Sequence, residues 1–384
     1  MRVKLSDIFD LQMGKTPSRN ELSYWGGNHK WVSIADISGA EKYIRTTKEC
    51  ITDRGVQESG IKAVPKGTVI MSFKLSIGRA AITAEDMFTN EAIMAFIDKH
   101  VLDIDASYLY YLFSGTDWSA GTNRAVLGLT LNKAVLSQKE IEIPPLDAQL
   151  SAVRTLDKIS GLLALRKRQL VKLDELVKAR FVELFGDVVW NNRDWPLYQF
   201  SKITTSRLGK MLDAKQQTGN YQYPYLANFN VQWFRFDLDK LNEMDFSKEE
   251  QIEFSLRDGD LLVCEGGEIG RCAVWHNETQ PCYFQKAIHR VRCNKNYIIP
   301  DYLAWWFKYN CDHGGFASIE GAKATISHLP GAKLKVLNVA VPPLDLQERF
   351  AAFVEQSDKS KLAIQNSVDK LETLKAACMQ AYFG

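Results

Sequence analysis

The sequence predicts an α+β fold in which two related globular domains are separated by two long antiparallel coiled-coil helices, with pseudo-two-fold symmetry between the halves. Three observations support this prediction: an internal repeat with a period of about 195 residues, a long proline-free stretch that closes each repeat, and mixed strand and helix patterns elsewhere. The period is far longer than that of solenoid repeats, so each repeat is a domain with an appendage.

The internal repeat consists of short matching segments that occur in the same order in both halves. Pro144-Pro145-Leu146-Asp147 recurs as Pro342-Pro343-Leu344-Asp345. Four further pairs lie upstream: Gly14-Lys15 with Gly209-Lys210, Lys66-Gly67-Thr68-Val69-Ile70 with Asp258-Gly259-Asp260-Leu261-Leu262, Ile77-Gly78-Arg79-Ala80-Ala81 with Ile269-Gly270-Arg271-Cys272-Ala273, and Tyr108-Leu109 with Tyr302-Leu303. Matches that stay in order along the whole chain indicate a tandem duplication.

A long helix is predicted after each Pro-Pro pair, because proline ends the preceding strand and is not tolerated within a helix. In the first stretch, apolar residues recur every seven positions, which is typical of a seam that pairs with another helix; they are Leu156, Leu163, Leu170, Val177 and Leu184. The second stretch has a similar seam, which Lys361 and Lys375 weaken, made of Phe350, Val354, Ile364, Val368, Leu371, Cys378 and Tyr382. Each helix would be about 58 Å long.

The rest of each repeat has the pattern of strands with some helix. Strand patterns occupy residues 31–34, 69–73, 261–263 and 287–291, and aromatic-rich helices are predicted over 105–113 and 300–307. Residues 135–143 and 334–341 have the pattern of the last strand of each domain. The predicted boundaries are a first domain over 1–143, a first helical spacer over 144–186, a second domain over 187–341 and a second spacer over 342–384.

Composition and charge narrow the class of protein. Hydrophobic residues make up 46% and charged residues 24%, as in folded globular proteins. No stretch has the roughly 18–20 uncharged apolar residues of a membrane helix, and residues 1–9 lack the apolar core of a signal peptide. We therefore expect a cytoplasmic protein with no membrane partner. The net charge of +2 argues against tight DNA binding by the chain alone.

Catalytic and metal-binding motifs are not recognised in the sequence. The seven cysteines lack the tight pairs of a zinc site, and reduced thiols are expected. Gly14-Lys15-Thr16 resembles the end of a P-loop, but Phe9 stands where the upstream glycine is required. Neither Pro-Pro pair has the flanking residues of an amino-methyltransferase loop, and the six histidines show no nucleophile or metal arrangement. We expect a non-catalytic chain that holds neither a cofactor nor a metal.

Several segments together resemble the specificity subunit of Type I restriction-modification systems. The first domain opens like a target-recognition domain of that family, and the Pro-Pro-Leu-Asp-x-Gln segments ending at Gln149 and Gln347 resemble the starts of its helical regions. The other matching segments are Gly14-Lys15-Thr16-Pro17-Ser18-Arg19, Tyr24-Trp25-Gly26-Gly27, Trp31-Val32-Ser33-Ile34-Ala35-Asp36-Ile37 and the two Ile-Gly-Arg blocks. The resemblance covers essentially the whole chain. The second domain departs from it, because Gly209-Lys210 is not followed by Thr-Pro.

This resemblance implies a sequence-specific DNA-binding subunit that reads a bipartite, asymmetric target in double-stranded DNA. Two methyltransferase subunits would bind the helical spacers, carry S-adenosylmethionine and methylate adenine, and restriction (motor) subunits would join for cleavage. The partner subunits would also supply much of the phosphate contact that dominates DNA affinity.

Base-edge reading and phosphate contact both require polar or cationic side chains on exposed loops. In the first domain the candidates lie in three places: the opening motif, the turn after the glycine-led strand, and the segment before the last strand. They are Lys15, Thr16, Ser18, Arg19, Lys74, Ser76, Arg79, Asn123, Arg124, Thr130 and Asn132. In the second domain they are Lys210, Gln216, Gln217, Glu265, Arg271, Lys323, Thr325, Ser327 and His328, with the polar segment 228–235 in addition. Gly78 and Gly270 are assigned to tight turns, and Trp25, Trp31, Trp305 and Trp306 to the core.

Two other functions are compatible with the same sequence. The first is a coiled-coil scaffold without DNA specificity, in which the helices dimerise with a second copy of the chain. The second is a small enzyme that uses the cleft of one domain, with the other domain a degenerate copy. Light scattering on the isolated chain tests the former, and turnover without a partner subunit tests the latter.

Overall fold

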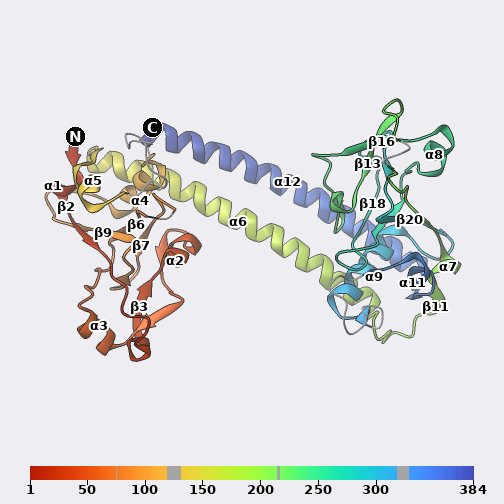
Figure 1. Cartoon of the computed structure of the whole chain (residues 1–384), viewed down its shortest axis with the longest axis horizontal. Coiled ribbons are helices and arrows are strands. Elements are labelled where there is room, and N and C mark those ends of the chain that lie inside the picture. The colour runs from red at the N-terminus through yellow and green to blue at the C-terminus, as the bar shows by residue number, and fades with distance from the viewer. Residues whose placement is uncertain (75, 119–130, 214–216, 318–327) are drawn as a thin grey trace. The chain divides into compact units, whose positions relative to one another are not determined.

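The computed structural model describes residues 1–74, 76–118, 131–213, 217–317 and 328–384. The chain forms two compact units: unit 1 contains Met1–Arg168 and Gln365–Gly384, and unit 2 contains Gln169–Ile364. Two helices of 40 residues each, α6 (Leu146–Phe185) and α12 (Leu344–Phe383), contribute to both units (Figure 1). The two long helices predicted after the Pro-Pro pairs are therefore confirmed.

Unit 1 combines a five-stranded sheet, in the order β2-β9-β6-β7-β4, with a three-stranded sheet, β5-β3-β8. Its strands are β1 (Arg2–Lys4), β2 (Phe9–Met13), β3 (Trp25–Val32), β4 (Tyr43–Ile44), β5 (Glu49–Ile51), β6 (Val69–Ser72), β7 (Ala80–Thr83), β8 (Phe88–Thr89), β9 (Ile93–Asp98) and β10 (Glu140–Glu142). Its short helices are α1 (Leu5–Ile8), η1 (Leu22–Tyr24), α2 (Ile34–Gly39), α3 (Asp53–Ser59), α4 (Ala106–Gly115) and α5 (Lys133–Gln138).

Unit 2 combines a four-stranded sheet, β12-β20-β17-β18, with a three-stranded sheet, β16-β13-β19. Its strands are β11 (Leu197–Gln199), β12 (Thr204–Leu208), β13 (Gln222–Leu226), β14 (Val231–Gln232), β15 (Arg235–Phe236), β16 (Asn242–Asp245), β17 (Leu261–Cys264), β18 (Cys272–Val274), β19 (Tyr283–Phe284), β20 (Ile288–Cys293) and β21 (Asn338–Ala340). Its short helices are α7 (Phe200–Ile203), η3 (Asn228–Asn230), α8 (Lys248–Glu253), α9 (Pro300–Asp312) and α11 (Gly331–Lys335).

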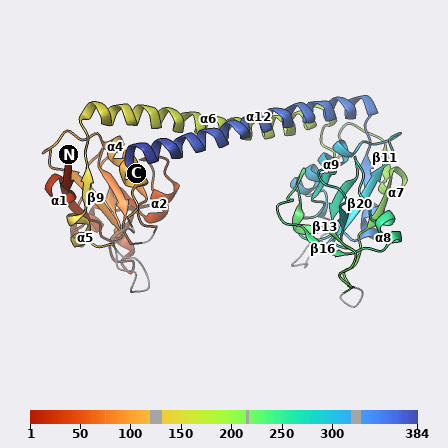
Figure 2. The ribbon, with the colours of Figure 1, turned by 90° about the horizontal axis from the view of Figure 1, so that it is seen from above.

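The two units repeat the same strand connections, as the internal repeat predicts. In unit 1, β3 pairs with β5 in antiparallel and with β8 in parallel orientation; in unit 2, β13 pairs in the same way with β16 and β19. We call these three-stranded sheets the tip sheets, because in each unit they lie on the side away from the long helices (Figures 1 and 2). The larger sheet and α4 or α9 form the base of each unit, whose core also includes residues of α6 and α12.

Two predicted strands are wrong in the same way in both units. Residues 135–143 and 334–341 were expected to be strands, but each segment contains a short helix, α5 or α11, before a three-residue strand. The side chain of Asn132 caps α5 by accepting a hydrogen bond from the backbone N–H of Val135 at 2.9 Å, a contact that favours a helix start. Similarly, Ile34 begins α2 instead of ending a strand, because Ser33 and Asp36 form a capping box.

One buried glutamine fixes the start of each long helix. Gln149 donates hydrogen bonds to Pro144 O and Asp103 O, both at 2.9 Å, and accepts one from the backbone N–H of Asp105 at 3.0 Å. Gln347 makes the equivalent bonds to Pro342 O, Tyr297 O and the N–H of Ile299. Both side chains are fully buried. The glutamine of the Pro-Pro-Leu-Asp-x-Gln motif thus ties each long helix to the segment that precedes α4 or α9.

Within each unit the segments of α6 and α12 pack against each other in antiparallel orientation. In unit 1, Ile159 and Leu163 of α6 form a buried cluster with Val368 of α12. In unit 2, the ring of Phe181 meets that of Phe350, with centroids 5.4 Å apart. None of the helices in the described part of the chain combines the length and the apolar character that a bilayer crossing requires.

Two residues of the second seam differ from the prediction. Lys361 is not a defect in the packing, because its ammonium group pairs with Asp174 of α6 at 2.9 Å and with Asp358 at 3.1 Å. These ion pairs raise its pKa overall, although desolvation alone would lower it. Tyr382 is exposed, and its neighbour Phe383 packs instead against Tyr108 of α4 at a centroid distance of 5.3 Å.

The two glycines assigned to tight turns have the backbone conformation that this role requires. Gly78 has φ of 86° and Gly270 has φ of 73°, a region that side chains disfavour. A Cβ at Gly78 would lie 2.6 Å from the ring of Trp118, and one at Gly270 would lie 2.8 Å from the ring of Phe307. Each glycine therefore also makes room for an aromatic side chain of the base.

Candidate nucleic-acid interface

In unit 1 the loop between β2 and η1 contains the first group of predicted contacts, and three of its side chains are held by the tip. The ammonium group of Lys15 donates to Ser59 O, and the Thr16 hydroxyl donates to the carboxylate of Glu91. Ser18 is exposed, and its carbonyl accepts a hydrogen bond from the indole N–H of Trp25 at 3.1 Å. The loop is thus fixed in position by hydrogen bonds to other segments of unit 1.

Arg19 is the most constrained cation of this loop. Its guanidinium makes a two-point ion pair with Glu49 of β5 and lies 3.9 Å from the ring centroid of Trp25. The hydrogen bond to Glu49 raises the pKa of Arg19, and the same bond lowers the pKa of Glu49. Trp31 is buried beneath, as its assignment to the core predicted, and Trp25 is half-buried against it. A guanidinium stacked and paired in this way keeps one orientation.

One cation of the second group of predicted contacts, Lys74, lies near Glu91 and so near the first group. A hydrogen bond from Thr16 lowers the pKa of Glu91 despite desolvation, and the charges of Lys74 and Arg19 lower it further. Lys74, Ser76 and Arg79 are all exposed in the turn between β6 and β7. The structure thus brings residues from two separate segments of unit 1 to one surface.

The third group of unit 1 is only partly described. Asn123, Arg124 and Thr130 lie outside the described residues. Asn132 is described, and its side-chain oxygen caps α5. That hydrogen bond gives Asn132 a structural role whether or not it also contacts a ligand.

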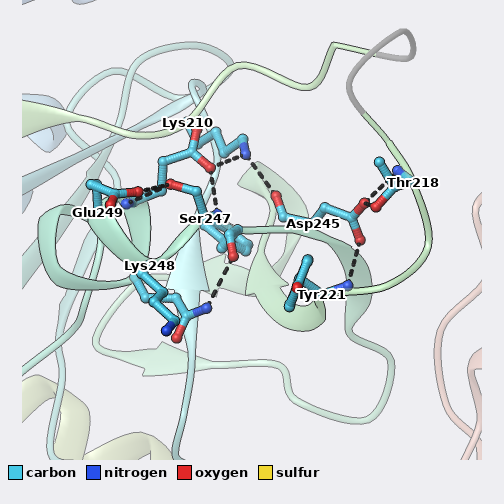
Figure 3. Close-up of a pocket in the computed structure, with 10 residues that line it drawn as sticks. Lys210, Thr218, Tyr221, Asp245, Ser247, Lys248 and Glu249 are labelled. Atoms are coloured by element: carbon cyan, nitrogen blue, oxygen red, sulfur yellow. Dashed lines mark hydrogen bonds and ion pairs between the residues drawn. The ribbon is translucent and has the colours of Figure 1, made fainter.

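In unit 2 the predicted contact Lys210 is buried, with a relative exposure of 8%. Figure 3 shows its ammonium group directed toward Asp245, to whose carbonyl it donates at 2.6 Å, and it also pairs with Glu250. The side chain stands over the ring of Phe246 at 5.0 Å. Lys210 therefore supports the tip sheet, in contrast to the exposed Lys15 at the matching position of the repeat.

Asp245, at the end of β16, holds the turn that leads into β13. Its carboxylate accepts hydrogen bonds from the backbone N–H and the hydroxyl of Thr218 and from the N–H of Tyr221 (Figure 3). It also accepts one from the N–H of Gly219. Desolvation raises the pKa of Asp245, but these bonds outweigh it and lower the pKa overall. We call Asp245 and its hydrogen bonds to this turn the Asp245 clamp. The predicted contact Gln217 is part of it, because its side-chain oxygen accepts a hydrogen bond from the N–H of Asp245 at 2.8 Å.

A second polar cluster of unit 2 surrounds the segment after β17. Arg271 donates to the side chain and the carbonyl of Asn228, at 2.6 and 3.0 Å. His328 is exposed and bridges to Gly266, and the carbonyl of Glu265 accepts a hydrogen bond from the N–H of Leu329 at 2.7 Å. The structure thus brings Glu265, Arg271 and His328 together. The predicted contacts Gln216, Lys323, Thr325 and Ser327 lie outside the described residues.

The sequence-based search missed the three acidic residues that organise these surfaces, namely Glu49, Glu91 and Asp245. Their partners lie 24 to 75 residues away in the chain, so local spacing does not indicate them. Over the described ranges, no group of three or more His, Cys, Asp and Glu side chains is arranged to hold a metal ion, and all seven cysteines are free thiols.

The comparisons with known proteins identify the family. The model of the Type I restriction modification DNA specificity domain matches residues 1–175 and 192–376. The chain is 29% identical over 188 residues to the Type I restriction enzyme MjaIX specificity subunit of Methanocaldococcus jannaschii, a match that covers 48% of this chain and 43% of that one. It is 26% identical to the EcoprrI specificity subunit of Escherichia coli, over 97% of this chain and 90% of that one.

Solved structures share the fold. The S subunit of a Type I restriction-modification system from M. genitalium superimposes with a TM-score of 0.58 at 13% identity. A second structure, from work on complex assembly and conformational transition of the type I R-M system, superimposes with a TM-score of 0.64 at 15% identity. Both alignments cover 100% of this chain and 96% or 97% of the other. The matches to the first two curated relatives span less than half of those proteins, 43% and 45%. The family model, which matches almost the whole chain, shows that this protein belongs to the Type I restriction modification DNA specificity domain family.

Proposed function

We propose that this chain is the specificity subunit of a Type I restriction-modification complex, in which each unit reads one half of a bipartite, asymmetric DNA target. The observation that supports this proposal most directly is that two units with the same strand connections carry differently built loops at their tips. Arg19 and Glu49 hold the loop of unit 1, whereas Asp245 holds the loop of unit 2. Related folds with different loops are suited to reading different base sequences.

The exposed cations of unit 1 are the strongest candidates for contact with DNA. The charges of Lys74 and Arg19 both act on Glu91, so the surface offers positive charge from two segments, and Arg79 is exposed in the same turn as Lys74. Cationic side chains neutralise phosphates, and a paired guanidinium such as that of Arg19 can be aimed at a guanine edge. In unit 2, Lys210 and Gln217 would act by supporting the tip, because their polar groups are engaged within the protein.

The long helices would serve as the docking site for two methyltransferase subunits, which would carry S-adenosylmethionine, and for the assembly of restriction subunits. Several apolar side chains of the helices remain exposed after α6 and α12 have paired, among them Leu165 at 56% and Leu362 at 64%. Exposed apolar side chains on a paired helix are suited to burial against a partner protein. The chain itself would be non-catalytic and would act in the cytoplasm, where the DNA target is found.

The uninterrupted helices would set the number of base pairs between the two half-sites. Each helix runs for 40 residues from the base of one unit into the other unit. The alternative scaffold function, in which the helices dimerise with a second copy, is less favoured because the described helix segments already pair within one chain. A monomeric mass by light scattering is the expected result for the isolated chain.

Methylation mapping tests the proposal. The chain is expressed with the methyltransferase subunits of its host, and modified adenines are located by sequencing. The expected result is a bipartite motif, of which one half changes and the other persists when residues 1–143 are replaced by those of another family member. If both halves changed, or if no motif were modified, the assignment of one half-site to each unit would be wrong.

A further inference from the structure

The turn formed by residues 217–221, beside the tip sheet of unit 2, is exposed and is held by several hydrogen bonds to Asp245. Thr218, Gly219, Asn220 and Tyr221 are all exposed, and Tyr221 has a relative exposure of 62%. Asp245, which holds this turn, is by contrast only 6% exposed. A surface turn with this exposure would ordinarily adopt several conformations, so the attachment selects one of them.

The attachment of Gly219 and Tyr221 uses their backbone N–H groups, which leaves the side chain between them available. The carboxylate of Asp245 takes the N–H of Gly219 at 2.9 Å and that of Tyr221 at 3.2 Å, which fixes the backbone on both sides of Asn220. The backbone N–H of Asn220 itself meets the Thr218 hydroxyl at 3.3 Å. The direction in which the Asn220 side chain leaves the turn is therefore determined by its neighbours.

The polar side chains that precede Asn220 in the turn are already engaged. Thr218 donates its hydroxyl to Asp245, and Gln217 uses its amide oxygen for the N–H of Asp245 and its amide nitrogen for Asp213 O. The carboxamide of Asn220, by contrast, has no hydrogen-bond partner among the residues that the structure describes. Within the described turn, Asn220 thus keeps both a donor and an acceptor for an external ligand.

The chemistry of a free carboxamide on a fixed turn points to one class of ligand. An asparagine side chain matches the N6 donor and N7 acceptor of adenine in the major groove with two parallel hydrogen bonds. Such a pair discriminates between bases only when the side chain is held in place. The nearby depression, of about 440 Å³, is lined by Tyr221 and by the exposed cation Lys248, which can meet a phosphate.

We propose that Asn220 is a base-reading residue for the half-site bound by unit 2, and that Asp245 is the residue that positions it. This inference rests on the proposed function and extends it, because it assigns one position of the target to one side chain. Asp245 does not touch DNA itself; it determines where the carboxamide of Asn220 lies.

The test compares the variant N220A with the control N296A, in the full chain assembled with the methyltransferase subunits of its host. Asn296 is a matched control, because it is also an exposed asparagine of unit 2 but lies in the turn before α9, next to Tyr297, whose carbonyl binds Gln347 of α12. N220A is expected to relax the preference at a single position of one half-site by about ten- to hundred-fold. N296A is expected to leave the motif unchanged.

The variant D245N tests the positioning role separately. An asparagine retains only one oxygen for the donors of the turn, so the Asn220 side chain loses its fixed direction. D245N is expected to relax the same position as N220A while the other half-site stays intact. A general loss of fold would instead reduce methylation at all positions together, and thermal unfolding of each variant detects that case.

The outcomes separate the inference from the function on which it rests. If the wild-type complex modifies a bipartite motif and N220A leaves every position of it unchanged, the inference is wrong and the proposed function stands. If N220A alone relaxes one position and D245N does not, Asn220 reads a base but Asp245 does not position it. If the wild-type complex modifies no motif, the proposed function fails, and the inference fails with it.

Discussion

The bases and the tips of the two units differ in how far the two copies agree. At the bases, Gln149 and Gln347 make the same three hydrogen bonds, and Gly78 and Gly270 make room for aromatic rings in the same way. The tips differ. In unit 1 an arginine that stacks on a tryptophan pairs with a glutamate, whereas in unit 2 a carboxylate binds backbone N–H groups. After duplication, the parts that hold the long helices stayed alike and the parts exposed to a ligand diverged.

This contrast teaches that the same task, fixing a loop, can be performed by unrelated side chains. Glu49 and Asp245 both lie on the strand next to the middle strand of the tip sheet, and each holds the loop that precedes that middle strand. Glu49 binds the side chain of Arg19, whereas Asp245 binds three backbone N–H groups and one hydroxyl. A loop held through its backbone leaves its side chains free to change, whereas a loop held through Arg19 depends on that residue.

Replacement of the buried glutamines has the largest expected effect on the bases. Gln347→Leu leaves an N–H and two carbonyl groups without partners in a buried position, which is expected to lower the free energy of unfolding by about 3 kcal/mol. Gln149→Leu is expected to have an equal effect in unit 1. Chemical denaturation measures both, with Gln356→Leu on the exposed face of α12 as the control. A clear difference between the two glutamines would contradict the equivalence of the bases.

Substitution of the turn glycines has the next largest effect. Gly78→Ala and Gly270→Ala combine an unfavourable φ with contacts shorter than 3 Å to Trp118 and Phe307. Each is expected to destabilise its unit by about 2 kcal/mol. Gly39→Ala is the control, because Gly39 lies in α2 with nothing within 4 Å of the added methyl group. Equal melting temperatures for Gly39→Ala and Gly78→Ala would show that the packing around Trp118 can yield.

Substitutions at the ion pair between Lys361 and Asp174 test how the two long helices pair. Asp174→Ala removes the ion pair with Lys361 across the seam, and because Asp174 is mostly exposed the loss is expected to be below about 1 kcal/mol. Lys361→Leu extends the apolar seam and is expected to keep or raise the unfolding midpoint. A larger loss from Lys361→Leu than from Asp174→Ala would mean that the lysine itself is required at this position of the seam.

The smallest expected effect concerns acid stability at the tips. The pKa of Asp245 is lowered in the folded chain, so its contribution to stability is complete above the ordinary aspartate pKa of about 4 and is lost as the pH falls through its lower folded value. Replacing it by asparagine is expected to make stability less dependent on pH below about 4. Unfolding followed between neutral and acidic pH measures this, and an unchanged slope would contradict the clamp.

The sequence was informative where a pattern repeats along the chain. The duplication, the two long helices and most of the seam followed from spacing alone. The errors at residues 135–143 and 334–341 arose because apolar, β-branched residues outweighed nearby helix-start signals such as Asn132. The clamps could not be predicted, because the pairing of Asp245 with Thr218 depends on two strands that the sequence pattern does not align. Lys210 was assigned to DNA on residue type, whereas burial determines its role.

The shared glutamine anchors have a consequence for how such genes can change. Each anchor joins the first turn of a long helix to backbone groups of its own globular part, and all three of its bonds use backbone atoms: two carbonyl oxygens, which every amino acid supplies, and one N–H, which every amino acid except proline supplies. A crossover between two related genes within the codons for α6 or α12 would transfer a foreign globular part together with its own intact glutamine anchor. New combinations could then fold at once, without compensating substitutions elsewhere in the protein.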